Sequence, residues 1–105
     1  MDLKIFWTDF SKSELRKIFN YHKEVANLRI AVKLVTEINQ EVAALQNQPK
    51  IGQREESLID REQEFRYMVY KNYKIIYWLN IKKNRIEITD VFDTRQNPIK
   101  IHRTS

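Results

Sequence analysis

Two cationic side chains, Lys74 and Arg95, are of the type that chemistry on an RNA phosphodiester requires when no metal takes part. In such a reaction a base removes the proton of the ribose 2′-hydroxyl, an acid protonates the leaving oxygen, and cations stabilise the charge on the phosphorus centre. A lysine acting as the base would need a lowered pKa. Spacing alone favours the simpler interpretation that Lys74 is an ordinary strand lysine, so both interpretations stay open.

The composition argues against most other kinds of catalytic or cofactor site. The chain has no cysteine, so it has no thiolate ligand or nucleophile, and its single glycine excludes a glycine-rich phosphate loop. The two histidines, His22 and His102, have no second metal ligand three or four residues away. We therefore expect neither a metal nor a cofactor. A Ser-His-Asp arrangement is not excluded by counting, although no nucleophile elbow is visible.

Positive charge is concentrated in the C-terminal part of the chain. Residues 1–64 contain 10 Lys and Arg against 11 Asp and Glu, whereas residues 65–105 contain 9 against 3. Six bases and no acid lie between positions 65 and 86. A block of this kind favours a polyanion, either nucleic acid or an acidic protein. A solvated strand face, with lysines that protect a sheet edge, explains the same pattern.

Length and composition predict a single globular domain, residues 1–105. The chain is 42% hydrophobic and 31% charged, which suits one packed core. No segment reaches the roughly 18 apolar residues that span a bilayer, and the N-terminus lacks the basic and apolar regions of a signal peptide. We therefore expect a cytoplasmic protein with no membrane association.

The N-terminal half predicts a strand followed by two helices. Residues 3–7 are apolar and aromatic, as in a strand. Ser11 and Glu14 have the spacing of a capping box before an amphipathic segment, and Asn27 is expected to cap a second helix. A loop between residues 46 and 54 ends this half. The second helix would bury one stripe at helical spacing: Ile30, Ala31, Leu34, Val35, Ile38, Val42 and Leu45.

The C-terminal half changes from a period of 3.6 to a period of two. After acidic residues between 55 and 64, interpreted as a solvated loop, three alternating segments follow at 65–70, 73–81 and 86–93. Short turns between them predict an antiparallel meander. The element order is then β-α-α-β-β-β. We therefore predict an α+β fold in which a helical hairpin packs on one face of an antiparallel sheet.

The other face of this sheet is too apolar for a fully solvated surface. Aromatic side chains interleaved with bases indicate a binding surface, for which RNA is one candidate. Cover by the C-terminal tail or by a partner is the alternative. The alternation assigns to this face the apolar Met68, Tyr70, Ile76, Trp78 and Val91 among Arg66, Lys74 and Thr89.

An ordered series of residues extends along nearly the whole chain. Its first part comprises Thr8, Leu15, Ile18, Ala31, Leu45, Pro49 and Gly52. Its second part comprises the segments 65–69, 73–77 and 86–98. This series resembles the RelE/ParE superfamily, the toxins of type II toxin–antitoxin modules, and is more specific to the superfamily than to one activity.

The resemblance implies a compact α+β toxin, of the kind found in plasmid stabilisation modules, that a cognate antitoxin neutralises. Operator DNA would be contacted only through the antitoxin. RelE-like members are mRNA interferases that cleave mRNA on the ribosome without a metal. ParE-like members inhibit DNA gyrase and have no known catalytic site of their own. A third possibility is an inactive member that only binds its antitoxin.

The residues place the chain nearer to the ParE-like branch. RelE-like nucleases have an arginine where Lys74 stands and another that Arg95 matches, but the tyrosine or His-Tyr pair that these enzymes use is missing. Segment 91–98 resembles the ParE-like ending, with Asp93 in place of a frequent histidine. The chain would then not be an enzyme. In the alternative, an endoribonuclease, Lys74, Arg95 and Arg66 would be catalytic.

Two binding surfaces follow from this interpretation. The expected target contacts are basic and lie near the C-terminus: Arg95, Lys100 and Arg103. The expected antitoxin contacts lie beside the helical hairpin and on the open sheet face: Tyr21, Met68, Tyr70 and Trp78. An acidic, amphipathic partner segment would complement the aromatic side chains and the positive charge.

Overall fold

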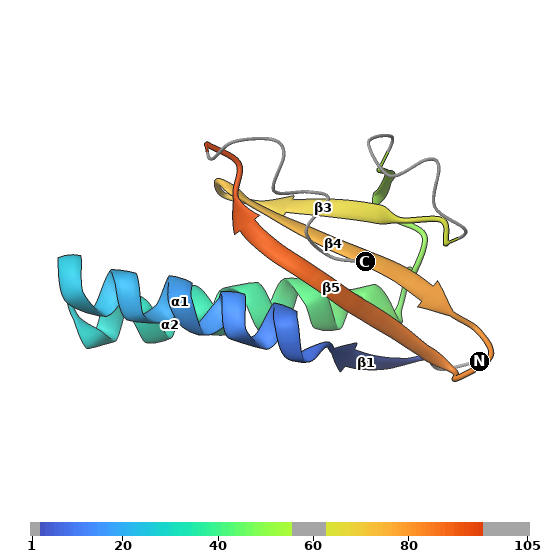
Figure 1. Cartoon of the computed structure of the whole chain (residues 1–105), viewed down its shortest axis with the longest axis horizontal. Helices are drawn as coiled ribbons and strands as arrows, with labels where there is room; N and C mark the ends of the chain where they lie inside the picture. Colours follow the sequence, from blue (N-terminus) through green and yellow to red (C-terminus); the bar gives the residue numbers. More distant parts are fainter. Residues whose placement is uncertain (1–2, 56–62, 96–105) are drawn as a thin grey trace.

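The structure, a computed structural model, describes residues 3–55 and 63–95. Two α-helices and a five-stranded sheet make up this part of the chain. The two helices lie along one face of the sheet (Figure 1). A single 3₁₀ turn, η1, follows the second helix. The elements in chain order are β1 (Lys4–Trp7), α1 (Asp9–Val25), α2 (Leu28–Ala43), η1 (Ala44–Gln46), β2 (Gln53–Arg54), β3 (Arg66–Tyr70), β4 (Tyr73–Asn80) and β5 (Arg85–Asp93).

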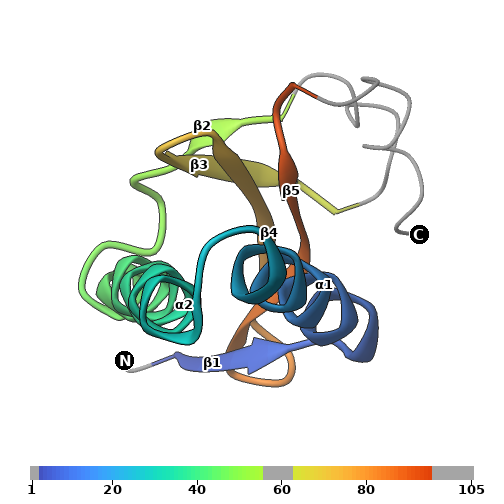
Figure 2. The ribbon, with the colours of Figure 1, turned by 90° about the vertical axis from the view of Figure 1, so that its left-hand side faces the viewer.

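The sheet has the strand order β1-β5-β4-β3-β2. Strands β3, β4 and β5 form the predicted antiparallel meander. Strand β1 instead pairs in parallel with β5, so the sheet is mixed. Parallel strands need a long connection between them, and the two helices are part of the connection from β1 to β5. The short strand β2, which the sequence analysis did not predict, adds to the free edge of β3. The two helices lie side by side on one face of the sheet, which curves around them (Figure 2).

The first helix begins three residues earlier than the capping box predicts. Thr8 is the N-cap, and its hydroxyl accepts a hydrogen bond from the backbone N–H of Ser11. Ser11 itself is fully buried, and its hydroxyl donates to the carbonyl of Thr8. The prediction of a cap at Ser11 is therefore wrong. Thr8 directly follows β1, and its N–H donates to the carbonyl of Ile88 in β5. This bond to the sheet holds Thr8 at the N-cap position.

The second helix begins where the sequence predicts. The side chain of Asn27 accepts a hydrogen bond from the N–H of Ile30 at 2.9 Å. Along α2 the buried residues are Ala31, Leu34, Ile38 and Val42, and Leu45 is buried in η1. Ile30, included in the predicted stripe, is exposed. The stripe therefore faces the sheet as expected, but it begins one residue later.

The loss of this cap is a direct test of how the hairpin of helices forms. We expect Asn27→Ala to lower the free energy of unfolding by about 1 kcal/mol, because the N–H of Ile30 loses its acceptor. Urea unfolding of the two proteins measures the difference. Asn39→Ala, at an exposed position inside the same helix, is the matched control and should not lower stability.

The side of the sheet that faces the helices carries the main core. The turn between β3 and β4 places Met68 opposite Ile75 and Tyr70 opposite Tyr73, and directly opposed residues share a face. Met68 and Tyr70 therefore pack against the main core beneath the helices. Their assignment to the open face is therefore wrong, whereas their role as antitoxin contacts stays a prediction. Counting the alternation along β3 without its pairing to β4 gave the opposite side of the sheet.

A β-bulge changes the alternation in β5 as well. Ile76 of β4 pairs with Asp90, but its neighbour Tyr77 pairs with Ile88, so Thr89 is the extra residue. The bulge moves Val91 to the helix side, where it is buried in the main core. The prediction that placed it on the open face is wrong for this reason.

The open face is buried at its centre. A second cluster of buried residues, Phe65, Ile76 and Phe92, lies there with Tyr67 and Trp78 packed against it. Ile76 and Trp78 are thus on the predicted side of the sheet. Trp78 remains partly exposed, so only the margin of this face is available for contact.

Candidate functional site

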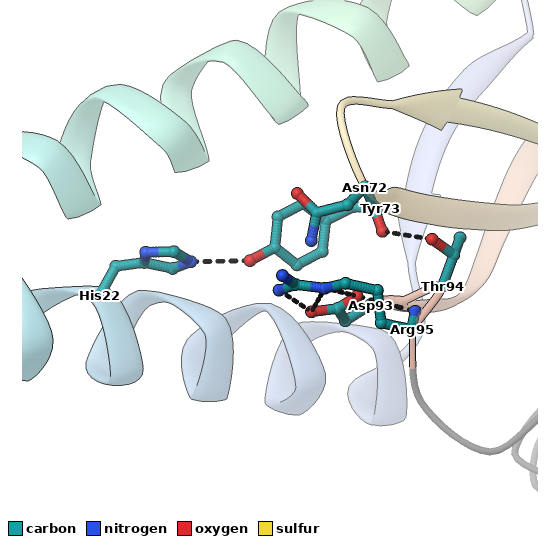
Figure 3. Close-up of polar contacts among 6 residues, drawn as sticks. All are labelled: His22, Asn72, Tyr73, Asp93, Thr94 and Arg95. Carbon is teal, nitrogen blue, oxygen red and sulfur yellow. Dashed lines mark hydrogen bonds and ion pairs between the residues drawn. The ribbon is translucent and has the colours of Figure 1, made fainter.

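Polar side chains from three elements meet at one end of the sheet. They come from the last turns of α1, from the start of β4 with the turn before it, and from the end of β5. The pairing of Tyr73 with Asp93 brings the two strand ends together. Figure 3 shows the group: His22, Asn72, Tyr73, Asp93, Thr94 and Arg95. We call these six residues the β5-end cluster.

Asp93 holds Arg95 in one orientation. One carboxylate oxygen of Asp93 accepts hydrogen bonds from the backbone N–H and the Nε of Arg95, both at 2.9 Å. The other accepts from Nη2 at 2.5 Å. This guanidinium is the main reason why the pKa of Asp93 lies well below its usual range, so the carboxylate stays ionised at physiological pH. The side chain of Arg95 is nevertheless 75% exposed.

His22 and Tyr73 join the first helix to the sheet. The Nε2 atom of His22 and the hydroxyl of Tyr73 lie 2.7 Å apart in a hydrogen bond. Burial raises the pKa of Tyr73, and the negative charge of Asp93 adds to this effect. The rings of Tyr21 and His22 are perpendicular, with their centres 5.2 Å apart, and Tyr21 is 61% exposed. An exposed tyrosine, a fixed arginine and a histidine–tyrosine pair thus share this end of the molecule.

Thr94 closes the same end through the backbone. Its N–H donates to the carbonyl of Asn72 at 2.8 Å, and its hydroxyl donates to the same oxygen at 3.0 Å. These bonds fix the exit of the chain from β5. Arg95 is the last residue that the structure describes, so the target contacts expected at Lys100 and Arg103, and the histidine His102, lie outside the described residues.

Lys74 lies on the open face of the sheet and forms a buried ion pair. Its Nζ is 2.6 Å from a carboxylate oxygen of Glu55, whose side chain is only 6% exposed. The same ammonium group lies 4.1 Å from the centre of the Tyr67 ring. The prediction that Glu55 belongs to a solvated loop is therefore wrong. Glu55 was missed because only the pairing of β2 with β3 brings it to Lys74.

The three cations expected in a nuclease site are not brought together. Arg66 pairs with Tyr77 of the helix side, where its guanidinium donates to the carbonyl of Gly52 and forms an ion pair with Glu64. Lys74 pairs with Phe92 of the opposite face. Arg95 lies beyond the end of β5. Arg66 and Lys74 thus face opposite sides of the sheet.

The ion pair with Glu55 indicates that Lys74 stabilises the fold, which is a different role from catalysis. Lys74→Met should lower the free energy of unfolding by roughly 3 kcal/mol, because it leaves the carboxylate of Glu55 buried without its counter-charge. The double substitution Glu55→Leu with Lys74→Met should recover most of that loss. Thermal or urea unfolding measures both. An unchanged stability in Lys74→Met would show that the pair contributes nothing to the fold.

An apolar groove lies along the helical hairpin on the side of β1. It has a volume of about 370 Å³. Two of its lining residues, Lys12 and Arg16, are exposed bases, and none of them is acidic. The full lining is Trp7, Lys12, Leu15, Arg16, Phe19, Val35 and Asn39. We call it the hairpin groove. Of its apolar residues, the sequence predicts Leu15, Phe19 and Val35 as the apolar side of the two helices and Trp7 as part of the first strand.

Neither a metal site nor a membrane span is found in the part of the chain that the structure describes. Residues 3–55 and 63–95 contain no group of three or more His, Cys, Asp or Glu side chains arranged to hold a metal ion. Neither described helix is long and apolar enough to cross a membrane.

Comparison with known proteins identifies the family. The model of the family described as "ParE toxin of type II toxin-antitoxin system, parDE" matches residues 5–98. A solved chain of the chromosomal ParDE toxin–antitoxin system from P. aeruginosa superposes with a TM-score of 0.71 at 16% sequence identity, covering 87% of this chain and 95% of that chain. No curated protein matches the sequence. The family match confirms the resemblance to the RelE/ParE superfamily on its ParE-like side, and the structural likeness confirms the fold. The chain belongs to the ParE toxin family of type II toxin–antitoxin systems.

Proposed function

We propose that this chain arrests growth by binding DNA gyrase and that a cognate antitoxin neutralises it by binding the toxin directly. The observation that carries the proposal is the family match, which extends over residues 5–98 and so includes both the helical hairpin and the β5-end cluster. Inhibition of this kind needs a contact surface and no catalytic constellation, which agrees with the separation of Arg66 from Lys74.

The β5-end cluster is the proposed target contact. Arginine and tyrosine are enriched among the residues that dominate protein interfaces. Arg95 is exposed yet held by Asp93, so it loses little conformational freedom on binding. Tyr21 lies exposed beside it on α1 and is shared between this proposal and the antitoxin surface. Lys100 and Arg103 stay proposed contacts of the same target.

The hairpin groove is the proposed seat of the antitoxin. An amphipathic helix would place its apolar side chains on Leu15, Phe19 and Val35 and its acids near Lys12 and Arg16. Binding of this kind buries apolar surface that the free toxin exposes to water. Trp78 stays a proposed secondary contact on the margin of the open face. Operator DNA would be reached through the antitoxin.

Growth measurements test this proposal. Induced expression of the chain alone should arrest growth, and co-expression of the protein encoded beside it should restore growth and co-purify with the chain. Arg16→Glu tests the hairpin groove, with Arg29→Glu, at another exposed position, as its control. Leu15→Glu is unsuitable because Leu15 also packs on the core. Growth that continues at full rate without the second protein would contradict the assignment as an active toxin.

A further inference from the structure

The first strand, β1, leaves one edge of the sheet open. It is the last strand in the order and pairs only with β5 among the described residues. The N–H groups of Lys4 and Thr8 donate to Asn84 and Ile88 on the β5 side. In a parallel ladder the bonding residues alternate, so the backbone groups of Ile5 and Trp7 point away from β5. The carbonyl of Leu3 on this edge already accepts a hydrogen bond from the side chain of Gln46 at 3.0 Å. The backbone donors and acceptors of Ile5 and Trp7 are thus the groups that another strand could pair with.

The core is also incompletely covered along β1. Ile5 and Trp7 direct their side chains toward the helices and pack against the main core, yet both are only partly buried. Strand β1 lies below the pair of helices (Figure 2), and no further strand pairs with its outer edge among the described residues. A further strand at this edge would bury both side chains.

Apolar grooves lie at the two ends of β1. The hairpin groove includes Trp7 at its C-terminal end. A second groove of about 550 Å³, the loop groove, includes Leu3 just before its N-terminal end. Two of its lining residues are largely exposed, Ile51 at 63% and Ile81 at 59%. The rest of the lining is Gln48, Pro49, Lys50 and Leu79.

The dimensions and charges fit one occupant. Leu3 and Trp7 are four residues apart, about 13 Å in a strand, so side chains at positions i and i+4 of an extended segment would reach both grooves. Among the described residues that line the two grooves, three are basic, Lys12, Arg16 and Lys50, and none is acidic. Lys4 adds an exposed base on β1 itself.

We infer that β1 is a strand-addition site for an acidic, extended segment of the antitoxin. The segment carries one apolar side chain into the loop groove and another against Trp7 at the end of the hairpin groove, beside the helix proposed to lie on Leu15, Phe19 and Val35. Backbone hydrogen bonds to Ile5 and Trp7 would provide affinity, and the two grooves would select the side chains. This inference rests on the proposed neutralisation by an antitoxin. It adds the loop groove and the edge of β1, at the far side from the β5-end cluster, to the surface that the antitoxin covers.

Amide hydrogen exchange measured by NMR tests the inference within a single strand. The probe is the protein encoded beside this chain, bound at saturation to the full-length chain. We expect the N–H groups of Ile5 and Trp7 to exchange at least tenfold more slowly in the complex. The N–H groups of Lys4 and Thr8, already bonded to β5, are the internal controls and should be protected in both states. Unchanged exchange at Ile5 and Trp7 in a formed complex would overturn the inference.

A pair of matched substitutions provides the second measurement. Ile51→Glu places a negative charge in the loop groove without opening the core, because the side chain is already exposed. It should weaken antitoxin binding at least tenfold, whereas Val69→Glu, at an exposed position on β3, should change binding less than twofold. Equal affinities would overturn the role of the loop groove. Protection of Ile5 and Trp7 in the free chain at high concentration would assign the edge to a second copy instead. Failure to form any complex would overturn the proposed neutralisation itself.

Discussion

Arg95→Ala is expected to reduce inhibition of gyrase supercoiling by roughly thirty-fold, as the loss of about 2 kcal/mol at a dominant interface residue does. The structural reason is that Arg95 is exposed and fixed at once. Its Nε and Nη2 are bonded to Asp93, which leaves the rest of the guanidinium free to face a partner. The toxin concentration that halves supercoiling by purified gyrase, compared between the two proteins, measures the effect.

Asp93 provides a second substitution that separates orientation from charge. Asp93→Asn keeps the size of the side chain but cannot hold the guanidinium through two charged oxygens, so we expect a smaller loss, of about threefold to tenfold. Lys17→Ala removes an equally exposed base from α1 and is the control that should leave inhibition unchanged. If Asp93→Asn strengthened inhibition, Asp93 would be a competitor for Arg95 and not its support.

Gly52→Ala is expected to destabilise the fold by about 3 kcal/mol, the upper part of the range for an overpacked core. A Cβ atom at this position would lie 2.4 Å from the hydroxyl oxygen of Tyr77 and 2.6 Å from the backbone oxygen of Tyr67. The φ angle of Gly52 is not positive, so the requirement is for space and not for an unusual backbone conformation. Tyr77 is fully buried and cannot move aside without disturbing the main core.

The hydroxyl of Tyr77 also forms two hydrogen bonds that anchor the loop containing Pro49 and Gly52. The hydroxyl of Tyr77 accepts from the N–H of Gly52 and donates to the carbonyl of Pro49, both at 2.9 Å. Tyr77→Phe should therefore destabilise by about 1 to 2 kcal/mol, less than Gly52→Ala. Urea unfolding measures both, with the exposed Gln48→Ala as control. A free energy of unfolding for Gly52→Ala within about 0.5 kcal/mol of the natural protein would contradict the crowding argument.

Much of the fold could be predicted because helical and alternating periods are properties of a short segment. The stripe of α2 and its cap at Asn27 are examples. The faces of β3 and β5 could not be predicted in this way, because a side chain's face depends on the neighbouring strand. The turn that sets Tyr70 opposite Tyr73 and the bulge at Thr89 decide which residues face the helices. A one-residue change in either reverses the outcome.

The candidate site was predictable only in its charges. Arg95 could be singled out from its type and its place after the last strand. Its fixed orientation follows from Asp93 two residues earlier, a spacing that the sequence contains but that also occurs in many loops. The bond between His22 and Tyr73 joins residues 51 positions apart, and the partner of Lys74 lies in a segment expected to be solvated. Such pairs arise from packing, which no local pattern records.

The most direct test of the account is a gyrase supercoiling assay with the purified chain, run beside a ribosome-programmed mRNA reaction examined by primer extension. If the chain inhibits gyrase as proposed, supercoiling is blocked, the protein encoded beside the chain relieves the block, and the mRNA stays intact. Cuts within codons that depend on ribosomes and are lost in Arg95→Ala, together with undisturbed supercoiling, would contradict it and make the chain a nuclease. Absence of both signals would leave only an antitoxin-binding member of the ParE family.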